Sequence, residues 1–152
     1  MVRHAWSVLC DRTIIDSTTG KVSLIDCVDQ LWVLDESYAS HGEKEGSGAE
    51  TKLTIATLWF RSDGEEGEVL QTQVSIQPPS GKAVPASSLD PEVRFPRGIL
   101  RTRVFTNVPV VPLRGPGHYQ FLLRLKQPSG RWKTYARLPL LVNFGKPTVP
   151  TS

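Results

Sequence analysis

The sequence predicts an all-β protein, a single-domain antiparallel β-sandwich of about 7–8 strands with Ig-like or C2-like Greek-key connections. Apolar, β-branched and aromatic residues occur in short runs, and twelve glycines and twelve prolines punctuate the 152 residues. No long segment has the periodicity of an amphipathic helix. A chain of this length typically forms one domain, so we expect a domain over 1–145 and a flexible C-terminal tail over 146–152.

Seven runs are expected to be strands, and a further short extended piece is expected near 82–95. The seven are residues 4–15, 21–34, 51–61, 68–77, 99–111, 117–127 and 131–144. A turn of helix can form near 86–92, where Ser and Asp side chains are available for capping. The segment 35–50 is polar, rich in Gly and Ser and net negative, so we expect it to be a mobile acidic loop.

The first two strands are predicted to form a hairpin. Residues 17–21, "STTGK", have the form of a three-residue loop in which Gly20 takes the left-handed conformation of a bulge. This register places Cys10 opposite Val28 and turns Trp6 and Val8 toward the core, so that both strands have one apolar face.

A competing register, shifted by one residue, places Cys10 opposite Cys27. It would permit a cross-strand disulfide, but it sets Asp11 against Asp26 and mixes the two faces. We therefore expect two free thiols, with Cys10 buried and Cys27 on the other face of the sheet. Two cysteines without a nearby His pair do not make a metal site.

The segment "LCDRTIIDSTTGKVSLIDCVDQLW", residues 9–32, resembles the opening of a family of small bacterial and phage-associated β-domains of unknown function. The segments "GPGHYQFLLRLKQPSGRW" and "LPLLVNF" are similar to the closing Gly-x-Tyr strand and the final hairpin of that family. These matches leave out the acidic segment 35–50. The resemblance implies a compact β-sandwich and no assigned chemistry.

No pattern typical of catalysis or cofactor binding is present in the sequence. It has no P-loop, dinucleotide fingerprint or Gly-x-Ser-x-Gly motif, and His4, His41 and His118 are not spaced as metal ligands. We expect no catalytic residue, no metal and no cofactor. No apolar run is long enough to span a membrane, and no signal peptide is recognisable, so we expect a cytoplasmic protein.

The distribution of charge is the most informative feature of the sequence. Residues 1–92 contain seven basic and all fifteen acidic side chains, whereas residues 93–152 contain eleven basic and no acidic side chains. Alternation along three strands predicts an outward basic face. Its members are Arg101, Arg103, Arg124, Lys126, Lys133, Tyr135 and Arg137.

The last hairpin is predicted to place like charges opposite one another. If Leu125 pairs with Trp132, then Arg124 lies opposite Lys133, and the resulting repulsion requires an acidic strand or an acidic partner nearby. We therefore expect a non-enzymatic interaction or scaffold module whose basic outer face binds an acidic protein. Three alternatives remain open: neutralisation of the face within the domain, nucleic-acid or phosphate binding, and an enzyme of unrecognised type. A homo-oligomer is also an open alternative.

Overall fold

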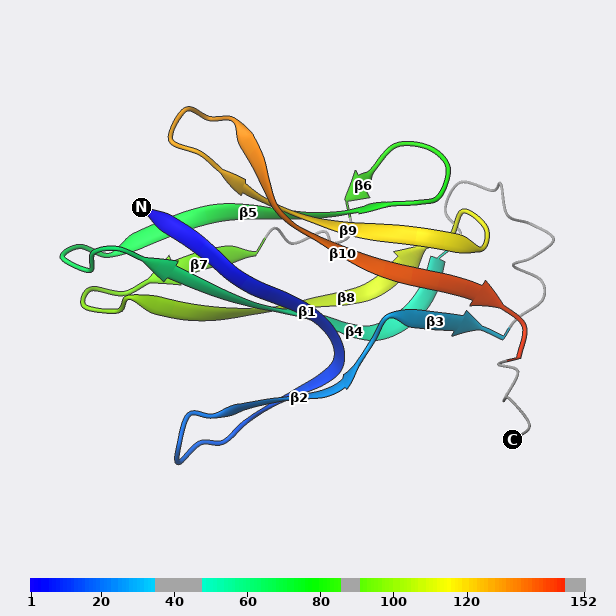
Figure 1. Ribbon diagram of the computed structural model, residues 1–152, viewed down its shortest axis with the longest axis horizontal. Coiled ribbons are helices and arrows are strands. Elements are labelled where there is room, and N and C mark those ends of the chain that lie inside the picture. The colour runs from blue at the N-terminus through cyan, green and yellow to red at the C-terminus, as the bar shows by residue number, and fades with distance from the viewer. Residues whose placement is uncertain (35–47, 86–90, 147–152) are drawn as a thin grey trace.

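The computed structural model describes residues 1–34, 48–85 and 91–146, and these contain strands and no helix (Figure 1). The strands are β1 (Val2–Ile15), β2 (Val22–Cys27), β3 (Gln30–Val33), β4 (Gly48–Arg61), β5 (Glu68–Gln77), β6 (Val84–Pro85), β7 (Glu92–Phe95), β8 (Arg101–Pro112), β9 (Gly117–Lys126) and β10 (Trp132–Phe144). Most of the predicted acidic loop, the helical turn and the tail lie outside the described residues.

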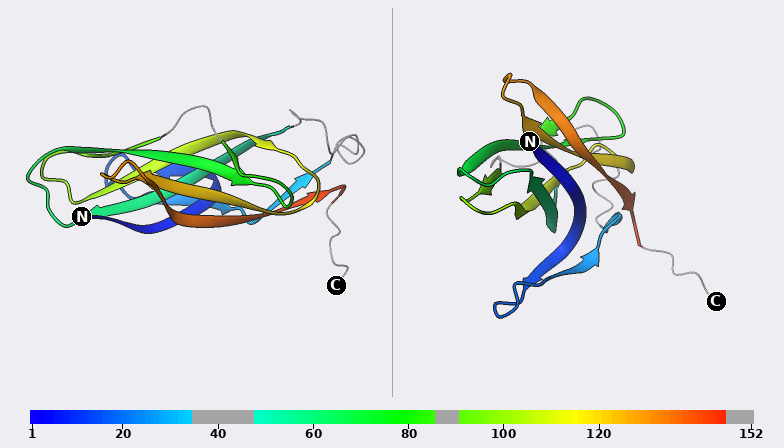
Figure 2. Two further views of the ribbon diagram at one scale, coloured as in Figure 1. Left: turned by 90° about the horizontal axis from the view of Figure 1, so that it is seen from above. Right: turned by 60° about the vertical axis from the view of Figure 1, so that its left-hand side comes forward.

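Two sheets pack against each other, which confirms the predicted β-sandwich (Figure 2). One sheet has the order β2-β1-β4-β8, and the other has the order β3-β10-β9-β5-β6, with β7 also paired to β5. Neighbouring strands are antiparallel except for β3 and β10, which run parallel. The predicted second strand, 21–34, is divided into β2 and β3, because the chain crosses from one sheet to the other between them.

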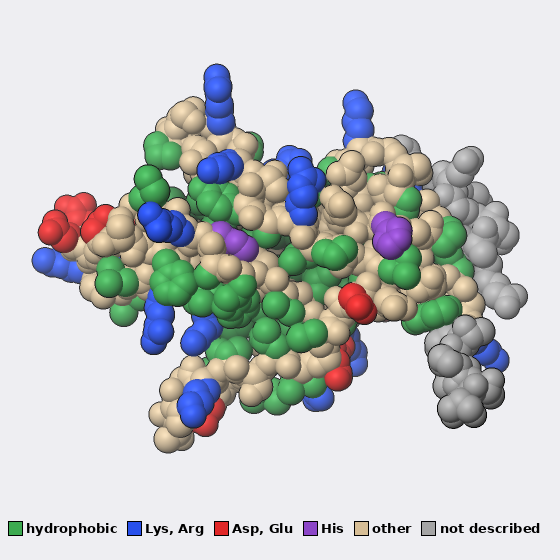
Figure 3. Space-filling view, viewed as in Figure 1, with side chains coloured by type: hydrophobic (Ala, Val, Ile, Leu, Met, Phe, Trp, Pro, Cys, Tyr) green, Lys and Arg blue, Asp and Glu red, His purple; other side chains and the backbone are tan. Residues whose placement is uncertain are grey.

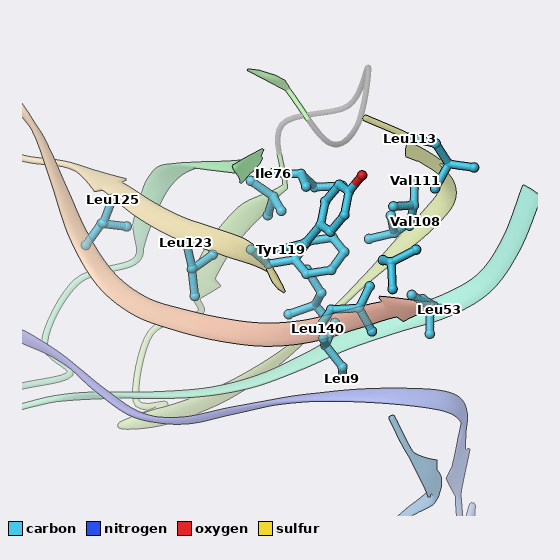
Figure 4. Packing of buried hydrophobic residues seen from close by; sticks show 14 of the residues in the cluster. Leu9, Leu53, Ile76, Val108, Val111, Leu113, Tyr119, Leu123, Leu125 and Leu140 are labelled. Carbon is cyan, nitrogen blue, oxygen red and sulfur yellow. The ribbon is translucent and has the colours of Figure 1, made fainter. Parts of the chain in front are cut away.

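Large side chains from both sheets fill the interior, and Figure 4 shows how closely they pack around Tyr119. The largest side chains that are fully buried are Trp59, Tyr119, Phe95, Phe121, Ile55, Ile76 and Leu140. The Tyr119 hydroxyl accepts a hydrogen bond from the Arg114 N–H at 2.7 Å and donates one to the Gly115 oxygen at 2.8 Å. These bonds satisfy the polar end of a buried ring and fix the turn that precedes β9.

The first hairpin adopts the register that we considered less favourable, in which Cys10 pairs with Cys27. Its loop has four residues between Asp16 and Lys21, which are joined by a hydrogen bond of 2.9 Å from the Asp16 N–H to the Lys21 oxygen. The Asp16 carboxylate also accepts hydrogen bonds from the N–H groups of Thr18 and Thr19, at 2.7 and 3.1 Å. This side chain caps the loop one residue earlier than expected and shifts every pair along the hairpin.

The competing register is accommodated by a local distortion at Asp26. This residue has a φ of 50°, in the left-handed region that Asp tolerates better than most residues. Gly20 has a φ of 65°, as the predicted loop requires.

Cys10 and Cys27 are both free thiols, as predicted, with Cys10 buried and Cys27 exposed. Because the two residues are paired directly across the hairpin, their side chains lie on the same face of the sheet, and the prediction that Cys27 lies on the other face is wrong. However, Cys10 does not point into the main core. Leu9 belongs to the core, so Cys10 and Val8 point to the outer face of the four-stranded sheet, contrary to our prediction for Val8. Burial raises the pKa of the Cys10 thiol, which donates to the Thr54 oxygen at 3.6 Å.

The last hairpin also differs from the prediction by one residue. Lys126 pairs with Trp132, and Arg124 pairs with Thr134, so the expected pairing of like charges does not occur. The register then shifts between Thr134 and Ala136, where Tyr135 is the extra residue of a β-bulge. The repulsion that we expected between directly paired like charges is therefore absent from this hairpin.

Candidate functional site

The seven residues of the predicted basic face do not share one surface. Arg101 and Arg103 lie on β8 in the four-stranded sheet. The other five lie on β9 and β10 in the six-stranded sheet, on the opposite side of the sandwich. The alternation of side chains predicted the outward direction of most of these residues, but it contained no information about which sheet each strand joins.

The outward basic residues of the six-stranded sheet are Arg124, Lys126 and Arg137. Lys126 Nζ donates to the Gln71 side-chain oxygen at 3.1 Å, and Arg137 donates to that of Gln120 at 3.4 Å. Neutral amides therefore contact two of these charges on the sheet surface.

Tyr135 turns toward the space between the sheets, contrary to our prediction, whereas Lys133 lies on the inner face of β10 and is exposed there, at the edge of the sheet. Lys133 pairs with the buried Leu125, and its Nζ lies 5.1 Å from the centre of the Tyr135 ring. The Tyr135 ring packs at 5.5 Å from the core residue Trp59. The bulge at Tyr135 changes the alternation that the sequence pattern assumed.

Among the described residues, none of the predicted basic side chains forms an ion pair. The ion pairs within these ranges are Met1 N with Asp63, Arg12 with Asp11 and Arg94 with Glu92. The described part of the molecule therefore gives no support to neutralisation of the basic residues by a neighbouring acidic strand.

The outer face of the four-stranded sheet brings arginine and aromatic side chains together in rows. One row runs from Arg3 through Phe60 to Arg101, and the next runs from Trp6 through Leu58 to Arg103. We call these six residues the arginine–aromatic face. It contains three cations and no carboxylate.

Exposure decreases along this sheet from the arginine–aromatic face toward the β1–β2 hairpin. Arg3, Phe60 and Arg101 are exposed, whereas Ala56, two rows further along, and Cys10, one row beyond it, are fully buried. The hairpin curves over this end of the sheet (Figure 2).

Arg103 joins the hairpin to the face, because its Nη1 donates to the Gly20 oxygen at the hairpin tip, at 3.3 Å. Figure 3 shows hydrophobic side chains gathered over the region of β1 and β4, with Lys and Arg side chains around them. The hairpin tip thus contacts the arginine–aromatic face at Arg103, whereas Arg3, Phe60 and Arg101 of this face are exposed.

Sequence reasoning missed four members of this face: Arg3, Trp6, Leu58 and Phe60. The pairing of β1 with β4 shifts between His4 and Trp6, so the alternation reverses inside a strand that looks regular in sequence. No turn residue marks this bulge, which is why Trp6 was expected to face the core.

No group of three or more His, Cys, Asp or Glu side chains within the described residues could hold a metal ion. Nor do these ranges contain a helix long and apolar enough to cross a bilayer.

No protein-family model matches the chain, and no curated protein sequence matches it. The crystal structure of the PmoD soluble domain from Methylocystis sp. ATCC 49242 (Rockwell) is similar, with 14% sequence identity over 94% of this chain and 97% of that chain. The TM-score is 0.30, so this similarity contributes nothing to the interpretation of the site.

Proposed function

We propose that the protein is a non-enzymatic interaction module that binds an acidic protein partner through the arginine–aromatic face. The observation that carries this proposal is the pair of rows in which Arg3, Arg101 and Arg103 flank Phe60, Leu58 and Trp6 with no acidic side chain among them.

The composition of this face favours binding. Trp, Phe and Arg are enriched at the centres of protein interfaces, where an aromatic ring contributes a large contact area and Arg binds carboxylates through two hydrogen bonds. Phe60 is 39% exposed, a considerable exposure for a large apolar ring beside charged groups. A partner strand or loop that alternates acidic and apolar residues would match both components.

The proposal is tested with a fluorescein-labelled peptide of alternating Glu and Phe residues, and binding is followed by fluorescence anisotropy. The test variant is Arg101→Glu with Arg103→Glu. The control is Arg124→Glu with Arg137→Glu, which changes the net charge equally on the opposite sheet. We expect the test variant to bind about tenfold or more weakly than the control, with affinity that falls as salt rises.

Equal loss of binding in both variants would show that binding depends on the net charge of the protein and not on the arginine–aromatic face. The absence of binding to the native protein would also contradict the proposal. A second candidate is single-stranded nucleic acid, because aromatic and Arg side chains on one sheet face can stack on bases and contact phosphates. If a labelled thymidine oligonucleotide binds more tightly than the peptide and loses binding in the same variant, nucleic acid replaces the protein partner.

A further inference from the structure

Two β-bulges face each other across the seam between the sheets. Ala5 is the extra residue on β1, and Tyr135 is the extra residue on β10. Two side chains from these bulges pack on the core ring of Trp59. The ring centre of His4, which precedes Ala5, lies 5.0 Å from that of Trp59, and the ring centre of Tyr135 lies 5.5 Å from it. Bulges often redirect side chains toward functional sites.

The seam is open along this stretch. Residues 2–9 of β1 pair with β4 on one side, and β2 joins on the other side from Cys10 onward. Residues 132–140 of β10 pair with β9, and β3 joins from Leu141 onward. Within the described ranges, neither edge has a strand partner across the seam, so a ligand can enter there.

A cavity of about 470 Å³ opens at this position. Its lining residues are Met1, Val2, Arg3, His4, Gln127, Lys133 and Tyr135. This volume lies within the range of about 300–1,000 Å³ that is typical of small-molecule sites. Arg3 and Lys133 are cationic, and no carboxylate is found among the described residues of the lining.

The polar groups of the cavity are arranged as donors. Gln127 Nε2 donates to the Tyr135 hydroxyl at 3.3 Å, and within the described residues the proton of that hydroxyl has no acceptor. The Lys133 ammonium lies against the face of the same ring. His4 shares a hydrogen bond of 2.6 Å with Ser7, and burial lowers its pKa, which favours the neutral ring at the cavity wall.

We propose that this cavity binds a small organic anion, whose carboxylate or phosphate group is held by Lys133 and the Tyr135 hydroxyl. The cation and the hydroxyl converge on the cavity, and its aromatic wall accommodates the apolar part of the ligand. This site is separate from the arginine–aromatic face, which was proposed to contact a protein partner.

The test uses phenyl phosphate and benzoate, which share a ring and differ in the anionic group, with benzylamine as the cationic control. Binding is followed by the chemical shifts of the Tyr135 and His4 rings. We expect saturable binding of one or both anions, weakened about tenfold in Lys133→Gln, because that variant loses a charge-assisted hydrogen bond. The matched control Arg137→Gln lies on the outer surface of the same strand and should leave the affinity unchanged.

Binding of phenyl phosphate alone would identify phosphate as the preferred group, and binding of benzoate alone would identify carboxylate. The proposal is overturned if neither anion saturates the shifts at concentrations up to about 50 mM, a generous limit for ligands of this size. Equal binding of benzylamine, or equal affinities in the two variants, would also overturn it. The circular dichroism spectrum of each variant establishes that the fold is retained.

Discussion

Replacement of Arg61 by Met should destabilise the protein strongly, although Arg61 contacts no carboxylate in the described structure. This side chain is buried, with 6% of its surface exposed. Its guanidinium donates to the oxygens of Ile99 at 2.8 Å, Glu66 at 2.6 Å and Pro96 at 2.8 Å. It therefore ties the β4–β5 connection to the β7–β8 connection.

The magnitude follows from the carbonyl groups of Ile99 and Glu66, which Arg61→Met would leave without this donor, whereas the Pro96 oxygen keeps the Ile99 N–H at 3.0 Å. Each acceptor without a partner at this partly buried place costs about 1–3 kcal/mol, and the lost desolvation cost of the charge offsets part of the sum. We expect a loss of about 3 kcal/mol in the free energy of unfolding. For a chain of this size, that corresponds to a melting temperature lower by about 6–12 °C.

The assay is equilibrium urea unfolding of the native protein, Arg61→Met and Arg97→Met. The last variant removes an exposed arginine from the same region and should change stability by less than about 0.5 kcal/mol. A loss below about 1 kcal/mol in Arg61→Met, with an unchanged m-value, would refute the view that Arg61 organises this end of the sandwich.

Three further predictions concern single groups. Tyr119→Phe should lower the free energy of unfolding in urea by about 1–2 kcal/mol, because it leaves the turn before β9 without its two hydrogen bonds; an unchanged midpoint would count against that role. The loop hydrogen bonds lower the pKa of Asp16 below 3.8, so the contribution of its carboxylate is present above this pH and is lost as pH falls through the lower folded-state value. The protection of the loop amides from hydrogen exchange, relative to an unstructured peptide at the same pH, should therefore fall in that acidic range, and Asp16→Asn should remove this pH dependence. In the folded protein, iodoacetamide should label Cys27 quickly and Cys10 only after unfolding, and equal labelling rates measured by mass spectrometry would contradict the burial of Cys10.

The sequence was sufficient to predict the strands and their packing into two sheets. Alternating apolar residues mark β8 and β9 clearly, and the left-handed Gly20 marks the first hairpin loop. Both kinds of signal are local, which is why they can be read without a structure.

The registers could not be predicted, because each depends on a single extra residue. The side chain of Asp16 adds one residue to the first loop, and the bulges at Ala5 and Tyr135 reverse the alternation within regular-looking strands. Because the side-chain period of a strand is two, one residue moves a side chain to the other face.

The candidate site could not be assembled from the sequence for a further reason, since it depends on the order of strands in each sheet. The sequence pattern grouped Arg101 and Arg103 with the basic residues of β9 and β10. The structure places them beside Phe60 and Trp6, on strands far apart in the chain. Sheet order is a long-range property, and local alternation does not determine it.

The central claim, that the arginine–aromatic face binds an acidic partner, is tested most directly by amide chemical shifts during titration with the alternating Glu–Phe peptide. We predict saturable shifts concentrated on β1, β4 and β8 around Arg3, Phe60 and Arg101. Such shifts should be absent around Arg124 and Arg137, on the opposite sheet. Saturable shifts centred on β9 and β10, or shifts spread evenly over all basic residues, would contradict the claim.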